Sequence, residues 1–263
     1  MGILDLFGMK DQVAIVTGGG RGIGAGIAKA FAEAGADVVV AARTPEQIEA
    51  TAEAVRGFGR RALPVRTDVL EEDQLQQLVD ATLAEFGRID VVVNNAGGWP
   101  PRPALATSTR EFEKAFRFNV TTAFALTRMA VPRIVETAGS GSVLNISSIA
   151  GRAISQCFAA YGTAKAALSF LTQELAQEFA PKVRVNAIAV GSTVTEALGS
   201  ILTPEIEKTM VDLTPMGRLG TVEDIAACAL YLSSPAASYV TGEIYGVNGG
   251  LTAVNMEMPR AFA

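Results

Sequence analysis

Short runs of β-branched and apolar residues alternate with helix-length, alanine-rich stretches along the whole chain. Residues 38–40 and 91–93 are valine throughout, so these runs are apolar on both faces. Such strands are typical of a parallel sheet that helices cover on both sides. The pattern predicts strands at 12–17, 37–41, 62–66, 89–94, 142–147, 183–189 and 243–247, and helices at 22–34, 45–57, 71–86, 109–138, 158–180 and 221–232. This alternation indicates an α/β fold with right-handed crossovers and about seven strands.

The composition is that of an ordinary globular protein and favours one domain spanning residues 1–263. The chain is 49% hydrophobic and 19% charged, and it shows no linker, repeat or low-complexity stretch. Its net charge of −5 argues against a nucleic-acid binder, and the absence of a basic amphipathic stretch argues against a membrane surface. No apolar run has the length of a membrane span, and the first residues lack the basic start of a signal peptide. We therefore expect a cytoplasmic protein.

Residue usage also excludes several kinds of chemistry. The chain contains no histidine, which removes Ser-His and Cys-His nucleophilic catalysis and most zinc chemistry. Cys157 and Cys228 lie far apart in apolar surroundings. We interpret them as buried, unreactive thiols, with a metal or disulfide role as the less favoured alternative. No metal site is predicted.

A glycine cluster follows the first predicted strand and leads directly into a helix. Residues 17–24 read Thr-Gly-Gly-Gly-Arg-Gly-Ile-Gly. Glycine allows a sharp turn and a close approach of pyrophosphate, and a helix N-terminus presents free N–H groups to phosphate. The cluster alone could be a tight turn, but its place in a βαβ unit favours a dinucleotide-binding, Rossmann-type doubly wound parallel sheet.

The end of the second strand bears on which dinucleotide is bound. An NAD site usually ends this strand with an acid for the ribose hydroxyls, whereas here Ala42 is followed by Arg43. Arg21 in the glycine loop adds a second cation, and a guanidinium can bind a 2′-phosphate through two hydrogen bonds. Either arginine alone could be a solvated surface residue. Together they favour NADP(H), with NAD(H) as the alternative.

Tyr161 and Lys165 are four residues apart in a predicted helix, so they share one helix face. A free tyrosine has a pKa near 10, and a nearby ammonium favours the phenolate. Taken alone, such a pair is more often a surface contact. The sequence predicts instead that Lys165, helped by an oxidised nicotinamide, lowers the pKa of Tyr161 toward the working range of an acid/base catalyst.

The spacing of Gly18, Gly22 and Gly24 resembles that of the short-chain dehydrogenase/reductase (SDR) family. Other matching elements occur in order from there to Gly250: Asp68-Val69, Asn94-Asn95-Ala96-Gly97, Asn119, Ser148, the Tyr161/Lys165 pair and Asn248-Gly249-Gly250. The loops resemble those of bacterial 7α-hydroxysteroid dehydrogenases, and the core motifs equally resemble 3-oxoacyl-[acyl-carrier-protein] reductases.

The resemblance implies a role for each matching position. Tyr161 would be the acid/base, Ser148 would hydrogen-bond the substrate oxygen in preference to Ser147, Lys165 would hold the nicotinamide ribose, and Asn119 would hold a relay water. The implied dinucleotide contacts are Gly18, Arg21, Gly22, Ile23, Arg43, Asp68, Val69, Asn95, Gly97, Tyr161, Lys165, Thr193 and Thr195. One departure is Val190, where the family usually has proline; we expect a more mobile turn there.

Two irregular stretches, 97–108 and 190–220, follow strand ends, where open α/β sheets bind ligands. We interpret them as substrate loops, the second a lid in which Thr203-Pro204 begins a helix; plain surface connections are the alternative. An apolar substrate pocket is expected from Trp99, Phe158, Gly191 and Met216, which could equally fill the core or an interface.

The sequence thus predicts an enzyme that interconverts a ketone and a secondary alcohol, with a 3-oxoacyl, steroid-like or other bulky carbonyl substrate. A non-catalytic dinucleotide-binding regulatory protein is the alternative, and an epimerase or dehydratase is disfavoured by chain length. Apolar positions on 109–138, 158–180 and the C-terminal residues 251–263, with the family resemblance, favour a homotetramer with D2 symmetry.

Overall fold

A computed structural model describes residues 2–199 and 202–256 of the chain. Seven parallel strands form one sheet in the order β3-β2-β1-β4-β5-β6-β7. The strands are β1 (Val13–Thr17), β2 (Asp37–Ala42), β3 (Ala62–Arg66), β4 (Val91–Asn94), β5 (Gly141–Ser148), β6 (Val183–Val190) and β7 (Ile244–Val247). The helices are α1 (Gly22–Glu33), α2 (Pro45–Gly57), α3 (Glu72–Phe86), α4 (Thr109–Phe116), α5 (Thr122–Ala138), α6 (Ala159–Phe179), α7 (Glu196–Gly199), α8 (Pro204–Asp212) and α9 (Val222–Ser233). The single-domain, doubly wound α/β fold is confirmed.

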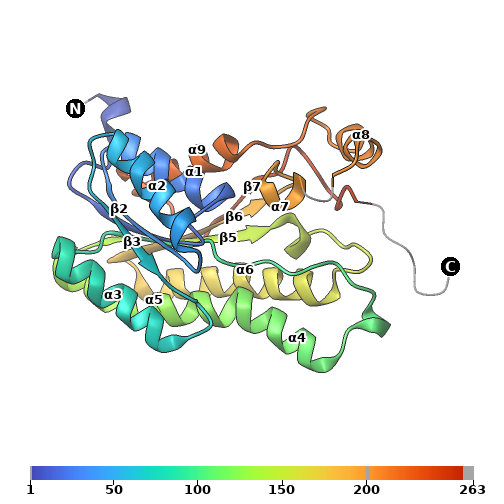
Figure 1. The fold of residues 1–263 in the computed structure, drawn as a ribbon, viewed down its shortest axis with the longest axis horizontal. Helices are drawn as coiled ribbons and strands as arrows, with labels where there is room; N and C mark the ends of the chain where they lie inside the picture. The colour runs from blue at the N-terminus through green and yellow to red at the C-terminus, as the bar shows by residue number, and fades with distance from the viewer. Residues whose placement is uncertain (1, 200–201, 257–263) are drawn as a thin grey trace.

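Helices cover both faces of the sheet, as the strands apolar on both faces predict. In Figure 1, α1, α2 and α9 lie above the sheet, and α3, α5 and α6 lie below it. Successive residues of β2 alternate between the two layers: Val38 and Val40 pack into the upper core, and Val39 and Ala41 into the lower one. Each buried valine contributes roughly 1.5–3 kcal/mol relative to exposure, so both layers are strongly fixed to the sheet.

The predicted helix over 109–138 is divided in the structure. Residues Arg117–Thr121 form a π-helical turn between α4 and α5. Apolar periodicity does not reveal such a turn, because one extra residue per turn leaves the helix continuous. The turn places buried Asn119 beside the sheet edge where the strands end.

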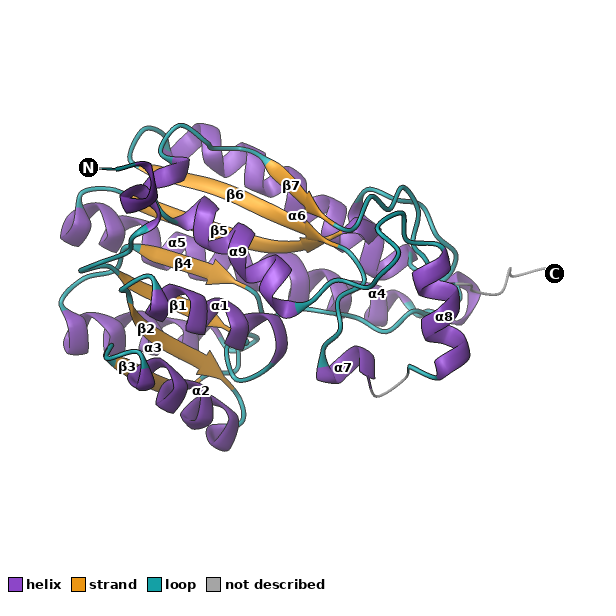
Figure 2. Ribbon diagram, turned by 90° about the horizontal axis from the view of Figure 1, so that it is seen from above, coloured by secondary structure: helices purple, strands orange, loops and turns teal. Residues whose placement is uncertain are grey.

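Residues 190–220 contain two helices, α7 and α8. The predicted cap is present: Thr203 Oγ1 accepts a hydrogen bond from the Ile206 N–H at 3.3 Å, and Pro204 occupies the first turn of α8. The two ends of the stretch meet, because the Val194 N–H bonds the Gly220 carbonyl at 2.8 Å and the Gly220 N–H bonds the Ser192 carbonyl at 2.9 Å. Figure 2 shows α7 and α8 beyond the carboxyl ends of the central strands.

None of the helices within residues 2–199 and 202–256 combines the length and apolarity that a bilayer crossing requires.

Candidate active site

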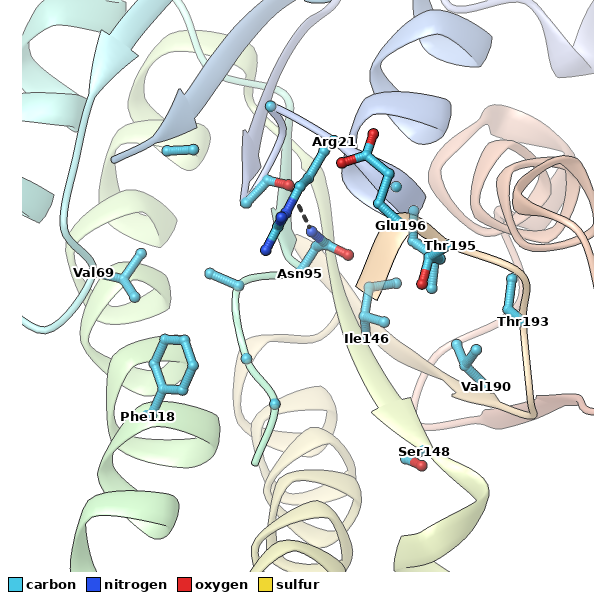
Figure 3. A pocket seen from close by; sticks show the side chains of 18 of the residues that line it. Arg21, Val69, Asn95, Phe118, Ile146, Ser148, Val190, Thr193, Thr195 and Glu196 are labelled. Carbon is cyan, nitrogen blue, oxygen red and sulfur yellow. Dashed lines mark hydrogen bonds between the residues drawn. The ribbon is translucent and has the colours of Figure 1, made fainter. Parts of the chain in front are cut away.

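A cavity of about 600 Å³ opens at the carboxyl ends of the strands. It lies where the strand order reverses between β1 and β4, which is the usual ligand position in open α/β sheets. Its lining includes every residue that the sequence assigns to the dinucleotide. These are Gly18, Arg21, Gly22, Ile23, Arg43, Asp68, Val69, Asn95, Gly97, Tyr161, Lys165, Thr193 and Thr195. Figure 3 shows part of this lining, with Thr193 and Val190 across the pocket from Val69 and Phe118.

The glycine loop has the geometry that a pyrophosphate requires. Gly18 has a φ of +61° and Gly22 a φ of +52°, a region that favours glycine. A Cβ at Gly18 would stand 2.8 Å from Asn95 Nδ2, so a larger residue there would displace this side chain. Arg21, the N-cap of α1, makes no side-chain hydrogen bond to the first turn, and the N–H groups of that turn remain available to an anion. These residues fit a dinucleotide.

Asn95 braces this loop from β4. Its Nδ2 donates to the carbonyl oxygens of Thr17 at 2.9 Å and Gly18 at 3.2 Å, and the latter bond is drawn in Figure 3. The Thr17 hydroxyl accepts in turn from the Asn95 N–H at 3.0 Å and the Ala96 N–H at 3.1 Å. Asn95 therefore joins the first and fourth strand ends beneath the cavity.

Arg21 and Arg43 both reach the cavity from exposed positions. Within the described part of the chain, neither guanidinium makes a hydrogen bond or an ion pair, whereas Arg56, Arg88, Arg128 and Arg218 each pair with a carboxylate. The position before Arg43 is Ala42, which also lines the cavity. Two unpaired cations therefore line the same cavity as Ala42, where the end of β2 carries no acid.

Ser148, Tyr161 and Lys165 meet at one end of the cavity. Ser148 ends β5, and its hydroxyl lies close enough to the Tyr161 phenol to lower the pKa of that phenol. The Lys165 ammonium lies 5.7 Å from the centre of the Tyr161 ring and donates to the Ile146 carbonyl at 2.7 Å. Ser147 points the other way, toward α6, where its hydroxyl bonds the Lys165 carbonyl at 3.1 Å.

Burial governs the ionisation of this trio. Desolvation raises the pKa of Tyr161, and the neighbouring Ser148 hydroxyl lowers it to a smaller extent. Desolvation also lowers the pKa of Lys165 to about 7. Burial is therefore the dominant influence of the protein's own groups on the Tyr161 phenol, and the expectation that Lys165 together with an oxidised nicotinamide lowers its pKa stays a prediction.

Asn119 does not line the cavity but stands directly behind it. Its Oδ1 accepts from the Gly98 N–H at 2.8 Å, and its Nδ2 donates to the carbonyls of Gly98 at 3.1 Å and Ala115 at 2.8 Å. A Cβ on Gly97 would come within 2.8 Å of Asn119 Oδ1 and 3.2 Å of Lys165 Nζ. The Asn119 side chain thus holds the 97–98 turn next to Lys165, and its part in a water relay stays a prediction.

The residues predicted to line a substrate pocket separate in the structure. Gly191 lines the main cavity, whereas Met216 lines a second cavity of about 300 Å³ that Gly191 also borders. Trp99 and Phe158 are half-buried and line neither cavity, although the Phe158 ring lies 6.3 Å from that of Tyr161. Val190 is the last residue of β6 and pairs with both Ser148 and Val247, so strand pairing holds it.

Several lining residues carry no signal in the sequence. Gln47, Phe118, Ile146 and Glu196 come from α2, the π turn, β5 and α7. Each belongs to an element that was predicted for other reasons or not at all, and only the packing of those elements brings the side chain to the cavity. The position of Phe118 directly before Asn119 was the one available hint.

Comparison with known proteins agrees with this geometry. A family model described as enoyl-(acyl carrier protein) reductase matches residues 18–252. An "uncharacterized oxidoreductase" of Mycobacterium tuberculosis is 51% identical, with 98% of each chain covered. The 7α-hydroxysteroid dehydrogenase of Escherichia coli is 40% identical over 92% of this chain and 94% of its own. A solved 7α-hydroxysteroid dehydrogenase complexed with NADH and 7-oxo glycochenodeoxycholic acid is 39% identical, covers 97% of this chain and 99% of its own, and has a TM-score of 0.92.

Fold, cavity and relatives together define an oxidoreductase built on a dinucleotide-binding sheet. The chain belongs to the short-chain dehydrogenase/reductase family.

Proposed function

We propose that this protein is an NADP(H)-preferring oxidoreductase that interconverts a ketone and a secondary alcohol, with Tyr161 as the acid/base. The observation that carries the proposal is the meeting of Tyr161, Ser148 and Lys165 at one end of a cavity whose other end is a glycine loop. NADPH would bind through the glycine loop and Lys165 and would supply the hydride to the carbonyl carbon.

The protein's own groups handle the proton. In ketone reduction the Tyr161 hydroxyl gives its proton to the carbonyl oxygen as that oxygen gains negative charge, and the Ser148 hydroxyl donates a hydrogen bond to the same oxygen. Burial keeps the pKa of Tyr161 raised, so the phenol retains the proton that reduction needs. In the reverse direction the phenolate accepts the alcohol proton, and a charged Lys165 near it favours that form.

The first experiment measures NADPH consumption with a panel of ketones for the wild type and for Tyr161→Phe. We expect turnover by the wild type and a loss of about 100-fold or more in kcat for the variant, because the proton donor is removed. NADPH binding without turnover on any ketone would favour the non-catalytic, regulatory protein. Equal turnover by both forms would remove Tyr161 from the mechanism.

The preference for NADP(H) rests on Arg21 and Arg43, whose unpaired guanidiniums reach the cavity, and on Ala42, which leaves the end of β2 without an acid that would repel a 2′-phosphate. NAD(H) is the alternative, and a similar solved structure holds NADH. Loss of one charge-assisted pair by Arg43→Ala should weaken NADPH binding about tenfold and leave NADH binding unchanged.

Arg66→Ala is the matched control for Arg43→Ala, since Arg66 is exposed at the end of the neighbouring strand β3 and does not line the cavity. Ala42→Asp should shift selectivity toward NADH because a carboxylate repels the phosphate and can accept from the ribose hydroxyls. Equal affinities for both dinucleotides in the wild type would contradict the assignment.

We assign an apolar carbonyl substrate, such as a 3-oxoacyl, steroid-like or other bulky ketone. Leu105, Ile154 and Val194 are 75%, 97% and 47% exposed on the loops that follow β4, β5 and β6. Large apolar side chains exposed on the loops at a binding edge favour an apolar ligand. A panel of steroid ketones, acyl thioesters and small polar ketones separates these classes, and activity on polar ketones alone would contradict the assignment.

The homotetramer with D2 symmetry and the cytoplasmic location stay predictions. For the former, Phe112 and Phe116 of α4, Phe124 of α5 and Phe170 of α6 are all more than a third exposed. Such apolar helix faces favour association. Light scattering that gives a monomeric mass would contradict the tetramer. Of the C-terminal residues 251–263, also expected to dock on a neighbouring subunit, residues 257–263 lie outside the described part of the chain.

A further inference from the structure

The C-terminal segment, residues 248–256, connects two parts of the active-site edge that are distant in sequence. On one side Leu251 and Val254 pack with Ile149 and Ala153 in a small apolar cluster. Ile149 begins the short 3₁₀ turn Ile149–Gly151, which directly follows Ser148. The C-terminal segment therefore rests on the turn that leads out of the serine strand.

That turn is in close contact with the helix that carries Tyr161 and Lys165. A Cβ on Gly151 would stand 2.7 Å from the Lys165 carbonyl carbon, and a Cβ on Gly162 would stand 2.8 Å from the Ala150 carbonyl oxygen. No side chain separates the turn from α6 at these two points. The turn, the serine and the helix thus form one rigid group against which the C-terminal segment packs.

On its other side the C-terminal segment holds the α8 segment, residues 202–220, through a buried amide. Asn255 is 2% exposed. Its Nδ2 donates to the Met210 carbonyl and to Thr214 Oγ1, both at 2.9 Å. Its Oδ1 accepts from the Ser192 hydroxyl at 2.5 Å, just past the end of β6. One side chain therefore ties the α8 segment to the strand end beside the cavity.

Backbone contacts also join the C-terminal segment to the α8 segment, but they involve residues after α8 and not the helix itself. The Met216 N–H donates to the Gly249 carbonyl at 3.1 Å, and a Cβ on Gly249 would stand 2.8 Å from Thr214 Cγ2. These contacts lie after the end of α8. Among the contacts of the described residues, Asn255 is the polar link from the C-terminal segment to the last turn of α8 at Met210.

We propose that Asn255 is a positioning residue: by joining α8 to Ser192, and through its own segment to the turn after Ser148, it fixes the α8 segment relative to Tyr161. Thr214 and Met216 of that segment line the second cavity, which shares Gly191 with the main one, so the position of the segment sets the substrate side of the site. This proposal rests on the proposed reduction of a carbonyl. The residue type is required by the chemistry, because an amide alone supplies two donors and an acceptor without charge. A leucine of similar volume would remove this partner from the buried Thr214 hydroxyl and the half-buried Ser192 hydroxyl, and would leave the Met210 carbonyl with only its bond from Thr214 Oγ1.

The test compares Asn255→Leu with the wild type and with Thr252→Ala, an exposed position in the same segment. Hydrogen exchange measures the opening of residues 204–216 directly. We expect exchange there to be about tenfold faster in Asn255→Leu, with β1 and β4 unchanged and Thr252→Ala like the wild type. The KM for the ketone should rise about tenfold, while the Kd for NADPH stays within about twofold.

Unchanged exchange over 204–216, or equally faster exchange in all elements, would overturn the proposal. An unchanged KM with faster exchange would also overturn it, since α8 would then be loosened without effect on the substrate. If Asn255→Leu does not fold, Ser192→Ala removes only one of the three bonds and must still speed exchange over 204–216. The hydrogen-exchange measurement needs no substrate. If the protein turns over no ketone, the proposed function is contradicted, while hydrogen exchange over 204–216 still tests whether Asn255 holds the α8 segment.

Discussion

Burial of the charged Lys165 ammonium destabilises the protein without nucleotide. Replacing Lys165 by a neutral residue should therefore stabilise the fold at low pH. Lys165 is 4% exposed, and burial lowers its pKa from 10.5 to about 7. Between pH 7 and pH 10.5, Lys165 is mostly neutral in the folded protein and mostly protonated in the unfolded chain. The unfolded state therefore binds more protons, and the free energy of unfolding rises with pH over this range. At 1.36 kcal/mol per unit, the folded protein bears a cost of about 5 kcal/mol at pH 6 and about 1 kcal/mol at pH 9.5.

Lys165→Met removes that charge with little change in volume. It also removes the donor to the Ile146 carbonyl, which costs about 2 kcal/mol for an unsatisfied buried acceptor. The net gain is therefore about 3 kcal/mol at pH 6, which corresponds to a rise in Tm of about 6 to 12 °C for a chain of this size. At pH 9.5 the gain should be gone.

Thermal unfolding of the protein without nucleotide, at one fixed protein concentration, measures both values. Lys182→Met is the matched control, since Lys182 is exposed and makes no side-chain hydrogen bond in the described residues. A Lys165→Met protein that is less stable than the wild type at pH 6 would refute the reasoning. So would a difference that does not change between the two pH values.

Three further outcomes are expected. Gly97→Ala should lower kcat about tenfold or more with the fold intact, because the new Cβ meets Asn119 Oδ1 at 2.8 Å and Lys165 Nζ at 3.2 Å; normal kinetics would contradict this close approach. The Thr221 hydroxyl caps α9 by accepting a hydrogen bond from the Asp224 N–H, so Thr221→Ala should lower the free energy of unfolding in urea by about 1 kcal/mol. An unchanged free energy of unfolding would show that the cap is dispensable. Protonation of Asp224, whose pKa the Arg218 guanidinium lowers, should weaken the same cap, so the effect of Thr221→Ala should shrink in strong acid rather than stay constant.

The succession of elements was within reach of the sequence. Val38-Val39-Val40 and Val91-Val92-Val93 are buried on both faces, so their hydrophobicity alone indicates a covered parallel sheet. The predicted helix at 45–57 agrees with α2 residue for residue, because Pro45 marks its first turn and Gly57 and Gly59 its end. The π turn around Asn119 was not predictable, since it changes the hydrogen-bonding ring and leaves the apolar pattern intact.

The sequence by itself determined the fold class and picked out the residues expected to bind a dinucleotide, all of which line one cavity, because glycine, strand and helix signals are local and obey fixed periods. Tertiary structure alone decided how those residues act on one another. The charge of Lys165 and the proton of Tyr161 depend on burial, and burial is a property of everything packed around a group rather than of its neighbours in the chain. The same holds for Asn255, which no motif marks and which contacts Ser192 across 63 residues of chain.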